Sequence, residues 1–153
     1  ELVRRIKEAL PEMAGGSAFA NGFERAGWST LEAAMPSLRE RAKTLVDLVQ
    51  GAEYLIARRP PDDKANAALD AEGRASNKAV LAVLASLDAA GWQPAALEAA
   101  VKTYVETSGL KLGKVAQPLR AALTGRTVSP PVFDVMTVLG REEALARIAE
   151  HAG

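Results

Sequence analysis

The 153-residue sequence predicts an all-α protein built from two small helical subdomains. Apolar residues recur at helical spacing along almost the whole chain, and no segment alternates apolar and polar residues for long enough to form a strand. Aromatic residues make up only 5% of the chain. The stretch RRPPDD at residues 58–63 contains two adjacent prolines, which cannot continue a helix. We therefore expect a first subdomain over residues 1–60 and a second over residues 61–153.

In the first subdomain, the capping-box pattern STLE at residues 29–32 predicts a helix start. Pro36 predicts the first turn of a helix over residues 36–50, and a short helix over residues 52–57 follows. Leucine and valine side chains mark the inward face of the 36–50 helix. Its basic residues are expected on the solvated face: Arg39, Arg41 and Lys43.

The second subdomain is predicted to consist of short helices joined by tight turns that contain proline or glycine. Pro94 and Pro118 are placed as first-turn residues, and Gly109 and Gly125 as the residues that end those two helices. The expected helices cover residues 80–87, 94–108, 118–124, 132–140 and 141–152.

Composition excludes several classes of function. The formal net charge is zero. Because there is no cysteine, no disulfide framework or thiolate metal site is possible. The only histidine, His151, cannot supply a zinc triad or a catalytic relay alone, and we interpret it as a fraying helix end. No apolar run could span a bilayer, and no phosphate-binding glycine loop occurs. We expect a cytoplasmic chain with no metal site and no catalytic residues.

Positive charge is nevertheless concentrated in places. The segment from Lys111 to Arg126 holds four basic residues and no acidic one. Two further basic groups lie at residues 39–43 and at Arg58 and Arg59. Confined positive charge indicates contact with phosphate, while ordinary surface lysines and arginines are the alternative explanation.

Three motifs carry a family resemblance. The segment KLGKVAQPLRAALTG is followed by SPPVFDVMTVLGREEALARI, and LRERAKTLVDL lies earlier at residues 38–48. In this order they resemble the C-terminal region of bacterial glutamyl-tRNA synthetases, which are class I aminoacyl-tRNA synthetases. The resemblance implies two all-helical subdomains that form a helical cage for the anticodon loop. It also implies that this chain is part of a longer protein, because the catalytic Rossmann domain and its His-Ile-Gly-His-type signature are missing.

The resemblance assigns roles to particular residues. Arg41 matches the arginine that inspects the third anticodon base, which is C for glutamate and G for glutamine. Arg120 matches the arginine that reaches the first anticodon bases, and Ser129-Pro130 matches the turn beside it. Ser129 stands where the family also has threonine, and Pro131 where glycine can occur. Two lysines are expected to contact phosphates: Lys111 and Lys114.

As a whole, the resemblance implies the tRNA-recognition part of an ATP-dependent glutamate–tRNA ligase. The complete enzyme would use ATP and Mg²⁺, whereas this chain alone is expected to need no cofactor and to be inactive in catalysis. We expect a monomer whose partner is a glutamate-type tRNA, and the sequence leaves glutamine-type tRNA open. The alternative is a helical protein-interaction module or a DNA-binding helix-turn-helix protein, which would prefer duplex DNA to a single-stranded loop.

Overall fold

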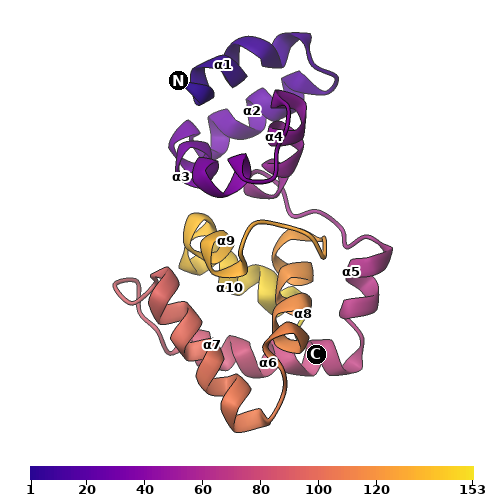
Figure 1. The fold of residues 1–153 in the computed structure, drawn as a ribbon, viewed down its shortest axis with the longest axis vertical. Helices are drawn as coiled ribbons and strands as arrows, with labels where there is room; N and C mark the ends of the chain where they lie inside the picture. Colours follow the sequence, from indigo (N-terminus) through magenta and orange to yellow (C-terminus); the bar gives the residue numbers. More distant parts are fainter. The chain divides into compact units, whose positions relative to one another are not determined.

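The computed structural model describes residues 1–153 and confirms the all-α fold class. The chain forms ten α-helices and two short 3₁₀ helices and contains no strand (Figure 1). It divides into two compact units, Glu1–Ala57 (unit 1) and Arg58–Gly153 (unit 2). None of the helices is both long and apolar enough to cross a membrane.

Unit 1 is a small helical body with its own core. Its elements are α1 (Leu2–Ala9), η1 (Leu10–Glu12), α2 (Gly16–Ala26), α3 (Trp28–Arg39), α4 (Leu45–Gly51) and η2 (Glu53–Leu55). Helix α3 packs against α1, α2 and α4. The side chains that fill the core come from every element: Ile6, Leu10, Phe23, Leu31, Leu38, Leu48, Val49 and Tyr54. The predicted short helix over residues 52–57 is reduced to the 3₁₀ turn η2.

The predicted helix over residues 36–50 is wrong, because the structure divides it between α3 and α4. Helix α4 has its own start signal: the Thr44 side chain accepts a hydrogen bond from the Asp47 amide, and the Asp47 carboxylate accepts one from the Thr44 amide. These reciprocal bonds satisfy amides at a helix N-terminus. Arg41 therefore lies in the connection between two helices and not on a helix face.

The capping box predicted at residues 29–32 is also absent. Helix α3 begins at Trp28, directly after Gly27, and no side chain caps it. Gly27 has a φ of 91°, which glycine adopts without strain. Pro36 lies inside α3 on its exposed side, where the helix loses one backbone hydrogen bond.

Unit 2 is organised around one central helix. Its elements are α5 (Asp63–Ala68), α6 (Ala71–Ala85), α7 (Pro94–Ser108), α8 (Leu112–Thr124), α9 (Val132–Leu139) and α10 (Arg141–Glu150). Helix α8 packs against α5, α6, α7, α9 and α10 (Figure 1). The predicted bounds of α7 are confirmed, and Gly109 and Gly125 end their helices with φ values of 72° and 71°.

Helix α8 begins at Leu112, so the prediction that Pro118 opens it is wrong. Pro118 is buried in the helix interior. The side chain of Asn77 on α6 donates a hydrogen bond of 3.1 Å to the Pro118 carbonyl, so this part of α8 is packed against α6. Asn77 also donates to the carbonyl of His151 at 3.1 Å. The end of α10 is therefore packed against α6 and is not frayed.

Candidate nucleic-acid interface

The turn between α8 and α9 brings three of the predicted site residues together. Arg120 lies half-buried on α8, and its Nε donates a hydrogen bond of 3.0 Å to the hydroxyl of Ser129. Ser129 is buried and donates its own hydroxyl proton to the carbonyl of Pro130 at 2.7 Å. The geometry thus joins Arg120 to the turn that follows its helix.

This arrangement changes the expected role of Ser129. The Ser129 hydroxyl already accepts one hydrogen bond and donates its only proton inside the protein. The Ser129 hydroxyl therefore orients the Arg120 side chain and stabilises the turn. Of the two side chains, the guanidinium is the better suited to a base edge, because its planar group can form paired hydrogen bonds. Because the guanidinium is planar and its Nε is fixed, it loses less conformational entropy when it binds a ligand.

The same turn carries an apolar residue that the sequence did not single out. The side chain of Val128 is 73% exposed and directly precedes Ser129. A single valine in a loop gives no signal in a sequence. Two aromatic side chains elsewhere, Tyr54 and Trp92, are buried, and the Trp92 indole donates a hydrogen bond to the Met136 carbonyl at 2.9 Å.

Lys111 and Lys114 lie apart from this turn. Both are exposed at the N-terminal end of α8, whereas the turn follows its C-terminal end. Lys114 and Arg120 are separated by roughly 9 Å along the helix axis at the usual rise per residue. Lys114 also lines a pocket of about 360 Å³ together with Asp70 and Glu72. Nearby carboxylates weaken the attraction of this lysine for phosphate.

Arg41 is exposed in the loop between α3 and α4 of unit 1. The Asp47 carboxylate fixes the end of this loop, because the backbone amides of Lys43 and Thr44 both donate to its Oδ2 at 3.2 Å. An arginine on a loop anchored in this way can reach a ligand without changing the helix that follows it.

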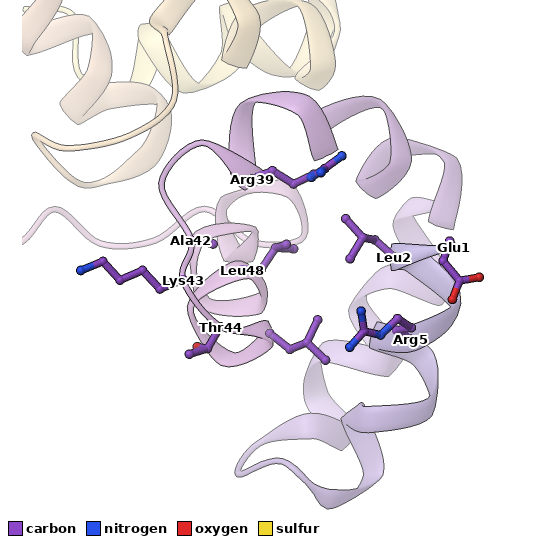
Figure 2. Close-up of a pocket in the computed structure, with 9 residues that line it drawn as sticks. Glu1, Leu2, Arg5, Arg39, Ala42, Lys43, Thr44 and Leu48 are labelled. Atoms are coloured by element: carbon purple, nitrogen blue, oxygen red, sulfur yellow. The ribbon is translucent and has the colours of Figure 1, made fainter.

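A cleft of about 770 Å³ lies beside the Arg41 loop, lined by Glu1, Leu2, Arg5, Arg39, Ala42, Lys43, Thr44, Leu45 and Leu48. Figure 2 shows that Arg5 and Arg39 extend toward the same space from α1 and α3, whereas Lys43 extends away from it. Sequence reasoning missed Arg5, because only the folded chain brings α1 next to the Arg41 loop.

Arg58 and Arg59 both form polar contacts with other residues of unit 2. Arg58 forms ion pairs with Glu143 at 2.8 Å and with Glu150 at 2.6 Å. Glu143 also pairs with the buried Arg147 at 2.9 Å. The hydrogen bond from Arg58, followed by that from Arg147, lowers the pKa of Glu143 from its usual 4.5 to about 2.

We expect the stability of unit 2 to fall at acid pH because of this carboxylate. A folded-state pKa below the unfolded one means that the Glu143 contribution is present above pH 4.5 and is lost as pH falls toward about 2. Glutamine does not titrate, so the melting temperature of Glu143→Gln should vary less between pH 5 and pH 2 than that of the wild type. Thermal melts followed by circular dichroism would measure this.

Glu142→Gln is the matched control, because Glu142 is 95% exposed and its one ion pair, with Arg141, is 3.5 Å long. Its melting temperature should follow the wild-type pH dependence. Parallel curves for the wild type and Glu143→Gln would show that the Arg58–Glu143 pair contributes no acid sensitivity.

Comparison with known proteins identifies the class. The chain belongs to the anticodon binding domain family, whose model matches residues 1–152. The sequence is 52% identical over 146 residues to glutamate–tRNA ligase 1 of Brucella melitensis and to glutamate–tRNA ligase 2 of Brucella ovis. These alignments cover 94% of this chain and 30% of each relative. The resemblance to glutamyl-tRNA synthetases is thereby confirmed, and the chain spans less than a third of the relatives' length.

Solved structures show the same fold. The chain superposes on a glutamate tRNA ligase from Elizabethkingia meningosepticum with a TM-score of 0.71 and 22% identity, over 94% of this chain and 30% of that one. A glutamate–tRNA synthetase from Elizabethkingia anophelis gives a TM-score of 0.69, also with 22% identity, over 95% of this chain and 30% of that one. The two-unit helical architecture is therefore that of the corresponding part of these enzymes.

Proposed function

We propose that this chain binds the anticodon loop of a glutamate-type tRNA, and that it serves a longer, ATP-dependent glutamate–tRNA ligase. The observation that carries the proposal is the match of the anticodon binding domain family to residues 1–152. The arrangement of Arg120 and Ser129 supports it, because sequence-specific RNA recognition uses side chains that meet the edges of unstacked loop bases.

The two units would divide the reading of the anticodon. In unit 2, Arg120 would meet the first anticodon bases, with Ser129 and Pro130 forming the wall of the turn. In unit 1, Arg41 would meet the third base, and Arg5 and Arg39 in the neighbouring cleft would attract the backbone phosphates. Phosphate contacts position the RNA, and contacts to base edges distinguish one tRNA from another.

Other properties of the complete protein follow from the same proposal. The complete enzyme would use ATP and Mg²⁺ in a catalytic domain outside this chain and would act as a cytoplasmic monomer. This chain itself would need neither cofactor for RNA binding, because the recognition groups described above are protein side chains.

We expect the isolated chain to bind an anticodon stem-loop of the glutamate type and to prefer it to a DNA duplex of similar length. Binding should weaken with salt, since each phosphate contact on a single strand contributes about 0.7 to the slope of log K against log salt. Gel-shift titrations at several salt concentrations would measure both quantities. A preference for the duplex would contradict the proposal and favour the DNA-binding alternative.

The same preparation tests whether this chain alone can attach glutamate to tRNA. Incubated with ATP, glutamate and tRNA, the isolated chain should attach no glutamate to the RNA. Charging by the purified chain would contradict the division of labour proposed here.

A further inference from the structure

The C-terminal end of α8 is held by arginines at consecutive carbonyl groups. Arg147 Nη1 donates to the carbonyl of Leu123, and Arg59 Nε donates to that of Thr124, each at 2.8 Å. Arg126 Nη1 donates to its neighbour Gly125 at 2.8 Å. The last carbonyls of a helix have no partner inside it and carry the negative end of the helix dipole. Guanidinium groups therefore stabilise this helix end through both hydrogen bonding and charge.

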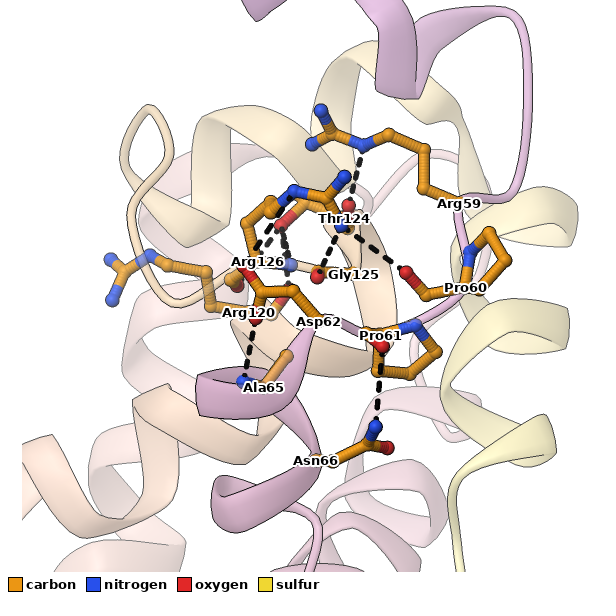
Figure 3. Close-up of polar contacts among 10 residues, drawn as sticks. All are labelled: Arg59, Pro60, Pro61, Asp62, Ala65, Asn66, Arg120, Thr124, Gly125 and Arg126. Carbon is orange, nitrogen blue, oxygen red and sulfur yellow. Dashed lines mark hydrogen bonds and ion pairs between the residues drawn. The ribbon is translucent and has the colours of Figure 1, made fainter.

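One of these arginines belongs to a segment that we call the strap, residues 58–62. The Asp62 amide donates to the carbonyl of Gly125 at 3.1 Å, and Arg126 Nη1 donates to the carbonyl of Pro60 at 3.2 Å. The strap and the Gly125 turn therefore each donate a hydrogen bond to the other (Figure 3). Its two prolines lack amide protons and have fixed φ angles, which limits the conformations of the strap.

The strap and the turn approach each other so closely that only glycine fits between them. A Cβ atom on Gly125 would lie 2.7 Å from the carbonyl oxygen of Arg59 and 3.0 Å from that of Pro60. The φ of 71° at Gly125 also disfavours any other residue. The contact between strap and turn is thus built into the backbone and does not depend on Arg59 alone.

A chain of hydrogen bonds connects Arg59 to the candidate reading site. The Thr124 carbonyl accepts a hydrogen bond from Arg59 Nε, and the Thr124 hydroxyl donates to the carbonyl of Arg120 at 2.9 Å. The same hydroxyl accepts a hydrogen bond from the amide of Arg126 at 3.2 Å. Arg120 in turn donates to Ser129. Movement of the strap would therefore reach Arg120 near the end of α8 and Arg126 at the start of the turn that contains Ser129.

We propose that Arg59 is a positioning residue for anticodon recognition, which acts through Thr124 on the Arg120–Ser129 turn and does not contact RNA phosphate. This inference rests on the proposed function of that turn. Under this proposal Arg59 orients other protein groups, whereas the basic charge in the sequence had indicated a phosphate contact. Thr124 is the second residue of this arrangement, because it is almost completely buried and forms hydrogen bonds with Arg59 of the strap, with Arg120 on α8 and with Arg126 in the turn.

The test compares Arg59→Gln with wild type in stem-loop binding by gel shift across a range of salt concentrations. We expect the dissociation constant to rise on the order of threefold to tenfold, because a loosened turn spends less time in the binding conformation. The salt slope should stay unchanged, whereas loss of a phosphate contact would lower it by about 0.7 and overturn the proposal. Lys64→Gln, which removes an exposed positive charge from the neighbouring α5, is the charge-matched control.

Thr124→Val supplies a second variant that removes the connecting hydroxyl and keeps the side-chain shape. It should weaken stem-loop binding as Arg59→Gln does, with the wild-type salt slope. In an Arg120→Ala background, Arg59→Gln should cause no additional loss, because its effect passes through Arg120. Additive losses, or wild-type binding by Thr124→Val, would overturn the proposal.

Amide hydrogen exchange separates this proposal from the proposed function. In folded Arg59→Gln, the Arg126 amide, which is bonded to Thr124, should exchange roughly tenfold faster than in wild type, as expected for loss of a charged hydrogen bond. Unchanged exchange would overturn the positioning role. If wild type failed to bind any stem-loop while the exchange changed as expected, the proposed function would fail and the link from strap to turn would stand.

Discussion

Arg120→Ala should weaken binding of the glutamate-type anticodon stem-loop by about tenfold to a hundredfold. This range lies within the roughly 1–3 kcal/mol that a good bidentate base contact contributes in groove recognition. The loss should be larger for the cognate stem-loop than for one with altered first anticodon bases, because contacts to base edges carry specificity and phosphate contacts do not. Fluorescence titration of both stem-loops would measure the two losses.

Two controls separate binding from folding in this experiment. The melting temperature of Arg120→Ala should stay close to that of wild type, because Arg120 is only half-buried. Lys102→Ala removes an exposed positive charge that pairs with Glu98 on α7, and it should leave stem-loop binding nearly unchanged. Equal losses for the two variants would reduce the role of Arg120 to its charge, and a large drop in melting temperature would make it a structural residue.

The helices that the sequence predicted well have their start and stop signals in the chain itself. Pro94 and Gly109 bound α7 as expected, because a proline is compatible with a first helical turn and a glycine with the left-handed residue after the last one. The same logic failed at Pro36 and Pro118, which lie inside helices. A local rule cannot show that Asn77 of a distant helix binds the carbonyl of Pro118.

The candidate site was predictable to a similar extent. The family motifs predicted that Arg120 lies beside the turn that holds Ser129, and the structure brings the two side chains within hydrogen-bonding distance, because Ser129 follows the helix that carries Arg120 by only a few residues. The partners of Arg58 and Arg59 were not predictable, since Glu143, Glu150 and Thr124 lie far away along the chain. Charge in a sequence thus indicates where phosphate could bind, and only the fold shows which charges are already paired inside the protein.

Arg41→Gln should narrow the preference for C over G at the third anticodon base more than it weakens binding overall. Arginine has only hydrogen-bond donors. The pairing edge of cytosine offers two acceptors, its ring nitrogen and its carbonyl oxygen. Guanine offers donors at two of its three pairing positions, so a guanidinium facing it in the complex would be left without partners and repelled. Glutamine can present either a donor or an acceptor, so its penalty against guanine should be smaller.

The experiment uses two stem-loops that differ only at the third anticodon base, and it compares their dissociation constants for each variant. We expect the ratio of the two constants to fall by about tenfold, which corresponds to roughly 1.4 kcal/mol. Arg39→Gln is the matched control, because Arg39 is exposed in the neighbouring cleft and should weaken binding of both stem-loops equally if it meets phosphate. An unchanged ratio for Arg41→Gln would remove Arg41 from the reading site. A lower ratio would place Arg41, as the group that distinguishes the third base, on a loop whose end is fixed by the Thr44–Asp47 cap. Asp47→Ala should then lower the same ratio, because it removes the cap that fixes the loop and leaves Arg41 itself unchanged.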